Sequence, residues 1–160
     1  MALGDNTLRS AAGNSQRGRN PYMVQTTLNW ATALSDKGSA LAAADVIPVI
    51  AVPKGTMVLN AGIEVDTATD GSTFTVDLGM VDADVFVDGF DATSAAAVVA
   101  QNPAAYQPVM AVADDNIDVT IATLSGGAVT SGKFRVWAVL MDCTDIGDMA
   151  ANEVDRDTLA

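Results

Sequence analysis

Short runs in which apolar and polar residues alternate recur along most of the chain. In residues 22–30, Tyr22, Val24, Leu28 and Trp30 fall on one side, and mostly polar residues fall on the other. A period of two places successive side chains on opposite faces of an extended backbone. This run therefore predicts a strand with one buried face.

Three later runs show the same period of two, and each predicts another strand. They are residues 73–79, 116–124 and 133–142, and a shorter apolar run occupies residues 106–113. Their expected buried positions are Phe74, Val76 and Leu78; Ile117, Val119 and Ile121; and Phe134, Val136, Ala138 and Leu140. The serine- and glycine-rich link at 125–132 predicts that the last two strands form a hairpin.

Residues 46–52, VIPVIAV, form an apolar, β-branched run that predicts a strand packed on both faces or nearly so. Pro48 has no N–H to donate to a neighbouring strand, so this strand is expected at a sheet edge or to be irregular there. Residues 52–55 place proline and glycine at the second and fourth positions of a type I turn. The following strand, residues 56–68, contains an Asn-Ala-Gly triplet at 60–62 that predicts a bulge or a bend.

Four further segments lack this regularity. Residues 31–45 are small and alanine-rich, and they predict either one or two helical turns or a long loop. Residues 80–105 alternate briefly at 85–87, but their aspartates favour a short helix followed by a loop. Residues 1–21 predict an extended arm, and residues 143–160 predict an acidic tail.

Seven or eight short strands, with turn signals about every ten residues, predict an all-β fold, an antiparallel β-sandwich, over residues 22–142. The 160 residues suffice for one domain. Hydrophobic residues make up 49% of the chain and aromatic residues only 5%, so the core must consist mostly of aliphatic side chains.

Charge is distributed unevenly. Residues 1–40 carry four basic and two acidic groups, whereas residues 41–160 carry four basic and eighteen acidic groups. The net charge of the whole chain is −12. An acidic body repels phosphate, so we expect no nucleic acid partner and no anionic membrane surface. No apolar run is long enough to span a bilayer, and the first residues do not form a signal sequence.

Residues suited to catalysis or metal binding are scarce. The chain has no histidine and one cysteine, Cys143, which excludes an intramolecular disulfide and the usual zinc and nucleophile–histidine sites. Asp82 and Asp84 have the spacing of a calcium loop, but Phe86 stands where the next ligand belongs. The sequence predicts no catalytic residue, metal site or cofactor; a solvated acidic loop or helix start is the simpler interpretation of these aspartates.

Several single residues admit two interpretations. Trp30 and Trp137 fit core or interface packing better than ligand stacking, and Cys143 fits a small residue at a strand end. Arg17 and Arg19, beside Gly18, are either solvated charges or anchors of the arm on an acidic neighbouring surface. As candidate partner-binding residues of the arm we select Arg9, Arg17, Arg19 and Tyr22.

The segment KGSALAAADVIPVIAVPKGTMVLNAGIEVDTA resembles the head decoration, or cement, proteins of tailed phages, particularly cyanophages. TFTVDLG, DADVFVDGFDATSA and GKFRVWAVLMD continue the resemblance, which covers residues 22–142. It implies a β-sandwich or jelly-roll module without a cofactor, located on the outer surface of the virion capsid. It also implies two partners, the major capsid protein and further copies of the chain in a homotrimer.

Three functional hypotheses follow. The first is a virion protein, made in the host cytoplasm, that bridges major capsid subunits and stabilises the shell. The second is a phage tail or fibre module that binds a host glycan, for which the few aromatic residues offer little support. The third is an enzyme that uses paired aspartates, with calcium.

Overall fold

Strands account for most of the computed structural model, which describes residues 20–95, 98–100 and 108–143. The elements are β1 (Tyr22–Asn29), α1 (Trp30–Lys37), β2 (Val46–Val52), β3 (Thr56–Thr67), β4 (Thr73–Gly79), β5 (Val87–Asp91), β6 (Val98–Ala100), β7 (Val109–Met110), β8 (Asp115–Ser125) and β9 (Lys133–Asp142). Apart from Asn20, Pro21 and Cys143, the predicted arm and tail lie outside the described residues.

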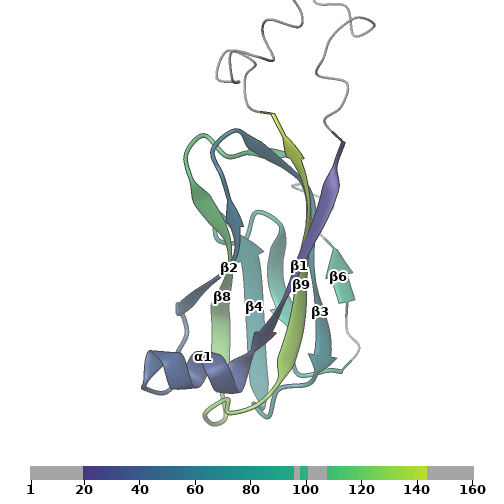
Figure 1. Cartoon of the computed structure of the whole chain (residues 1–160). Coiled ribbons are helices and arrows are strands. Elements are labelled where there is room, and N and C mark those ends of the chain that lie inside the picture. Colours follow the sequence, from purple (N-terminus) through teal and green to yellow (C-terminus); the bar gives the residue numbers. More distant parts are fainter. Residues whose placement is uncertain (1–19, 96–97, 101–107, 144–160) are drawn as a thin grey trace, which may run out of the picture.

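The strands form two antiparallel sheets in jelly-roll order (Figure 1). One sheet runs β1-β9-β3-β6, with β7 also paired to β3, and the other runs β2-β8-β4-β5. The pairs are nested, because β1 pairs with β9, β2 with β8, β3 with β6 and β7, and β4 with β5. Nested pairs divided between two facing sheets define a jelly roll, so the predicted fold class is confirmed.

The core lies between the sheets and follows the predicted alternation. All ten positions expected to be buried in β4, β8 and β9 are buried, and Leu28 of β1 is as well. At one end the core is aromatic: the Trp30 ring centroid lies 4.9 Å from that of Phe74 and 5.2 Å from that of Phe134. Both pairs are edge-to-face, an arrangement that adds attraction to the burial of the rings.

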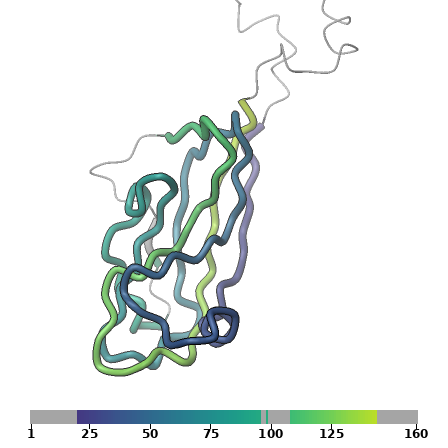
Figure 2. The backbone as a smooth tube through the Cα atoms, turned by 90° about the vertical axis from the view of Figure 1, so that its left-hand side faces the viewer, coloured from purple at the N-terminus to yellow at the C-terminus, as the bar shows by residue number. Residues whose placement is uncertain are grey.

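The predicted hairpin between the last two strands is wrong. β8 belongs to the sheet with β2 and β4, whereas β9 lies between β1 and β3 in the other sheet. Residues 126–132 therefore cross from one sheet to the other (Figure 2). The carboxylate of Asp70 holds this crossing by accepting hydrogen bonds from the Thr130 hydroxyl and from the N–H groups of Thr130 and Ser131.

The alanine-rich segment 31–45 begins with helical turns, which belong to α1. Trp30, expected as the last residue of the first strand, is the first residue of this helix. The Asn29 side chain caps the helix by accepting from the Ala31 N–H at 3.0 Å. Gly38 ends it with a φ of 69° and donates its N–H to the carbonyls of Leu34 and Ser35. α1 crosses the end of the sandwich opposite to that at which β1 begins (Figure 1).

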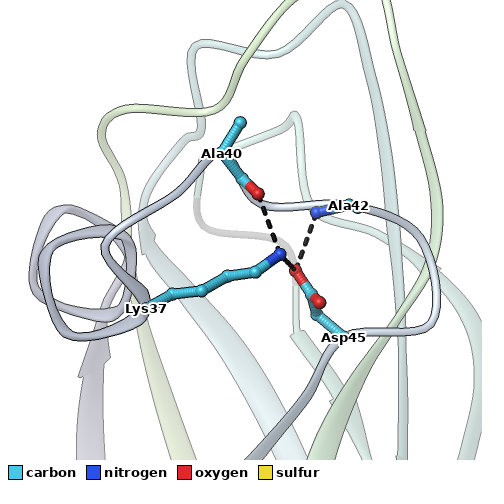
Figure 3. A network of polar contacts seen from close by, with 4 residues as sticks. All are labelled: Lys37, Ala40, Ala42 and Asp45. Atoms are coloured by element: carbon cyan, nitrogen blue, oxygen red, sulfur yellow. Dashed lines mark hydrogen bonds and ion pairs between the residues drawn. The ribbon is translucent and has the colours of Figure 1, made fainter.

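A small polar network fixes the loop between α1 and β2 (Figure 3). Lys37 donates to the Ala40 carbonyl at 2.8 Å and pairs with the Asp45 carboxylate, which also accepts from the Ala42 N–H at 2.7 Å. The Lys37 hydrogen bond, followed by that of Ala42, lowers the pKa of Asp45. The loop is therefore held in one conformation by side chains on both of its ends.

Among the described strands β2 pairs with β8 alone, which confirms its edge position, and the ladder is irregular between Pro48 and Ile50. The prediction that both faces are packed is wrong, because Val46, Pro48 and Ala51 are exposed. The predicted bulge in β3 is present, but it lies at Leu59, between Val58 and Asn60, one residue before the predicted triplet.

The turn between β2 and β3 lies one residue later than predicted. The Thr56 N–H donates to the Pro53 carbonyl at 3.1 Å, so the turn comprises residues 53–56. Gly55 then occupies the third position with a φ of 83°. A type II turn requires a positive φ at its third position. Gly55 meets this requirement, and this places the turn at residues 53–56 and not at 52–55.

Within residues 80–105, the described part contains strands β5 and β6 in place of the predicted helix. Residues 80–86 form a tight turn packed on Gly79, where an added Cβ would collide with the Asp82 carbonyl oxygen. The Phe86 N–H donates to the Leu78 carbonyl, and the Phe86 side chain is fully buried. Burial of Phe86 and Val87 overrode the weak helical preference of the aspartates.

Candidate interaction surface

The outward-facing side of the β1-β9-β3 sheet carries an unusual share of apolar side chains. Strand register places Met141, Met57 and Met110 in one row across β9, β3 and β7. The next row holds Met23 beside Val139, and the row after it holds Trp137 between Gln25 and Gly62. We call this surface the methionine face; its residues are Met23, Met57, Met110, Trp137, Val139 and Met141.

The methionine face is accessible to a partner. Met23 is 60% exposed and Met110 39%, and the other members are half-buried. At ordinary strand spacings its three rows and four strands span about 14 Å in each direction. Methionine side chains are flexible and polarisable, and they adapt to partner surfaces of irregular shape.

A polar row ends the methionine face toward the α1 end of the sandwich. Here Thr27, Arg135 and Glu64 are neighbours across β1, β9 and β3. The Arg135 guanidinium donates to the Glu64 carboxylate at 3.0 Å, and both side chains are partly exposed. Along β1, β9 and β3 the sheet thus changes from apolar at the end where β1 begins to charged in this row, which β6 continues with exposed Val98.

The outward-facing side of the other sheet is polar and acidic along β4 and β8, whereas its edge strand β2 exposes Val46, Pro48 and Ala51. Asp118 of β8 lies beside Gly79 of β4, and Asp77 of β4 lies beside Thr120 of β8. Partial burial raises the pKa of both aspartates. Nearby negative charges act in the same direction, from Asp88 and Asp84 on Asp77 and from Asp115 on Asp118.

An apolar groove opens at the end of the sandwich where β1 begins and β9 ends. Its volume is about 370 Å³, and it lies between residues 80–85 and 109–115. Its lining includes Val81, 93% exposed, and Val112, 79% exposed. Asp82, Asp114 and Asp115 form its acidic rim. A hydrogen bond and charge repulsion between the carboxyl groups of Asp82 and Asp84 raise the pKa of Asp82.

The candidate arm residues are placed only in part. Arg9, Arg17 and Arg19 lie outside the described residues. Tyr22 is the first residue of β1, pairs with Leu140, and is 46% exposed. It therefore lies at the same end of the sandwich as the groove and the apolar rows of the methionine face.

The other singled-out residues occupy different surroundings. Trp30 is fully buried in the core, as predicted, whereas Trp137 is half-buried on the methionine face. Cys143 follows β9, as expected, and donates its N–H to the Gly55 carbonyl at 2.8 Å. Phe86, which stands at the third position of the calcium-like spacing, belongs to the core.

The described residues form neither a metal-binding cluster nor a membrane-spanning helix. Within residues 20–95, 98–100 and 108–143, no three Asp, Glu, His or Cys side chains lie close enough together to hold a metal ion. In the same part of the chain, no helix has the length and apolar character needed to cross a membrane.

Comparisons with solved structures identify the fold. A chain of the cyanophage Pam1 capsid asymmetric unit superposes with a TM-score of 0.60 and 18% identity, over 88% of this chain and 97% of that one. A chain of the Ralstonia phage GP4 capsid superposes with a TM-score of 0.58 and 16% identity, over 79% and 86%. This jelly roll is a fold found in phage capsids. No protein-family model matches the sequence, and no curated protein matches it.

Sequence reasoning missed the methionine face, although each strand carried a signal for it. In residues 133–142, the outward positions 137, 139 and 141 are Trp, Val and Met, where an exposed strand face ordinarily carries polar residues. Only the pairing of β9 with β1 and β3 brings these side chains together with Met23 and Met57.

Proposed function

We propose that the protein is a structural protein of a phage virion that acts without catalysis or a cofactor. It is made in the host cytoplasm, binds the outside of the head, and bridges major capsid subunits so that the shell is stabilised. The fold that it shares with chains of two phage capsids supports a place in the virion.

The observation that carries the decoration role is the contrast between the two outward sheet faces. A protein bound to the outside of a shell needs one surface complementary to the shell and another that stays hydrated. The methionine face supplies apolar, adaptable area, and the Asp77–Asp118 side supplies charge. Exposed apolar area of this kind commonly marks a protein interface.

The proposal includes assembly as a homotrimer, the state that the resemblance to decoration proteins implies. Arg9, Arg17, Arg19 and Tyr22 contribute contacts from the arm to the assembled partners. Binding to the shell and not to separate subunits would stabilise the assembled state by mass action.

Co-sedimentation of the purified protein with phage heads that lack decoration tests the proposal. We expect saturable binding at a fixed ratio to the major capsid protein and a higher melting temperature of the shell. Met23→Glu should weaken binding at least about tenfold, because a charge would have to be desolvated in an apolar contact.

Val46→Glu is the matched control, since Val46 is 55% exposed on the edge strand of the other sheet, close to the 60% of Met23. It should bind heads as the wild type does. Folded, soluble protein that does not bind heads would overturn the proposal and make glycan binding the next function to test.

A further inference from the structure

The groove between residues 80–85 and 109–115 has two properties that together describe its occupant. Its lining is apolar, with Val81 and Val112 largely exposed, and its rim carries Asp82, Asp114 and Asp115. Asp84 adds a fourth carboxylate beside Asp82. An extended segment with small apolar side chains and several positive charges would complement both properties.

The rim charges have few basic neighbours. Among the described residues, ion pairs join Lys37 to Asp45 and Arg135 to Glu64, and neither includes a rim carboxylate. Among the described basic residues, Lys54 lies near the rim, because its backbone N–H donates to the Asp114 carboxylate. Four carboxylates against one ammonium group leave the rim negative.

Residues 1–19 match this description within the chain itself. They contain Arg9, Arg17 and Arg19 against the single acid Asp5, together with leucine and alanine. The remainder of the chain is strongly acidic, so this segment is its principal concentration of positive charge. Fully extended, nineteen residues reach at most about 65 Å.

The arm joins the sheet at one edge and the groove lies at the opposite edge, an arrangement that allows the arm of one copy to contact the groove of the next. β1, which follows the arm, forms one edge of its sheet, whereas β7, which lines the groove, lies at the opposite edge. The start of β1, to which the arm is joined, nevertheless lies at the same end of the sandwich as the groove. If the arm leaves one edge of the sheet and binds a groove at the other edge of the next copy, the contact is head-to-tail. Such contacts close into a ring when the rotation between successive copies permits it.

We propose that residues 1–19 bind the apolar, acid-rimmed groove of a neighbouring copy of this chain. Arg17 and Arg19 lie against the rim carboxylates, and apolar arm residues cover Val81 and Val112. The groove is thus the acidic neighbouring surface on which the arm is anchored. This interaction does not depend on head binding.

Cross-linking between two single-cysteine proteins tests the proposal in the full-length chain. Both carry Cys143→Ser; one also carries Ser15→Cys in the arm, and the other carries Val112→Cys at the groove. Because each protein has a single cysteine, a disulfide heterodimer forms only between chains. We expect this heterodimer after mixing and mild oxidation, measured on a non-reducing gel.

Val46→Cys replaces Val112→Cys in the matched control, since Val46 is also exposed but lies on β2, outside the groove. Arg17→Glu with Arg19→Glu should lower the heterodimer yield about tenfold. Adding Asp82→Arg and Asp84→Arg to the groove protein should restore it. Equal yields at Val112 and Val46, no interchain product, or failure of the charge exchange to restore cross-linking would overturn the proposal.

The head-binding assay separates this result from the proposed function. Cross-linking at Val112 with no binding to heads supports the arm–groove contact and contradicts the decoration role. Binding to heads without cross-linking at Val112 supports the decoration role and contradicts the arm–groove contact.

Discussion

At the scale of single residues, Ala44 adopts a backbone conformation that its side chain disfavours. Among the described residues other than glycine, Ala44 alone has a positive φ, of 69°. Its N–H donates to the Ile121 carbonyl at 2.8 Å, and the Asp45 carbonyl accepts from the Ile121 N–H. Pairing with β8 thus holds Ala44 in the left-handed region.

Ala44→Gly should stabilise the protein. A left-handed conformation costs an L-residue about 1–2 kcal/mol, and glycine loses about 0.5–1 kcal/mol more backbone entropy on folding. We expect a net gain of about 0.5–1 kcal/mol in the free energy of unfolding, measured with urea. Ala42→Gly, in the same loop, should lower stability, and equal effects of the two substitutions would contradict this explanation.

The core residues of the long strands could be predicted individually. Phe74, Ile117 and Phe134 follow a period of two that a buried face requires, and each is buried. Trp30 was assigned to the right environment but to the wrong element. The residue-level pattern reports burial, and it does not distinguish the last position of a strand from the first position of a helix capped by Asn29.

At the scale of elements, the crossing between β8 and β9 depends on Asp70. Its carboxylate accepts from Thr130 and Ser131 across sixty residues of sequence. The Thr130 hydroxyl, then the Thr130 N–H and Ser131 N–H, lower the pKa of Asp70 to about 2. The crossing therefore gains stability from the ionised carboxylate.

Asp70→Asn should destabilise the protein by about 1 kcal/mol at pH 7, a value reduced for solvent screening because Asp70 is exposed. Since folding lowers the pKa of Asp70 below about 4, its contribution is present above that pH and is lost as pH falls toward 2. The free energies of unfolding of the wild type and the variant, measured with urea, should therefore converge as the pH falls from 4 to 2. A constant difference across this range, or the same loss for the exposed control Asp66→Asn, would contradict the assignment.

The elements that could not be predicted share a physical reason. Turn signals at 125–132 mark where the chain reverses, but they do not state which sheet the next strand joins. The Asp70 contact and the pairing of β9 between β1 and β3 decide this, and both join distant parts of the sequence. Likewise β5 forms because Phe86 and Val87 are buried by tertiary packing.

At the scale of the whole molecule, the methionine face is apolar and the opposite face is acidic along β4 and β8, and the sequence alone does not reveal this contrast. On its own strand, each outward methionine is a single apolar residue at a position where a polar residue is usual. Register brings Met141, Met57 and Met110 into one row, so the surface exists only once the sheet order is known. The negative body, by contrast, follows directly from composition.

The same asymmetry predicts how the protein behaves as its charge is removed. At pH 7 the net charge of −12 opposes association, and this repulsion falls as pH approaches the isoelectric point of about 4.1. The methionine face should then drive association between molecules. Met23→Gln should weaken it about fivefold, since about half of a methionine side chain, worth about 1 kcal/mol, would lose its apolar contact.

Sedimentation velocity at pH 7 and pH 5 measures this effect, and Met23→Gln leaves the formal charge of the protein unchanged at both pH values. Val46→Gln provides the comparison, because Val46 is exposed to a similar extent on the opposite sheet and faces Thr120. It should associate at pH 5 as the wild type does. If both substitutions reduce association equally, general hydrophobicity drives it; if only Met23→Gln does, the contact runs through the methionine face.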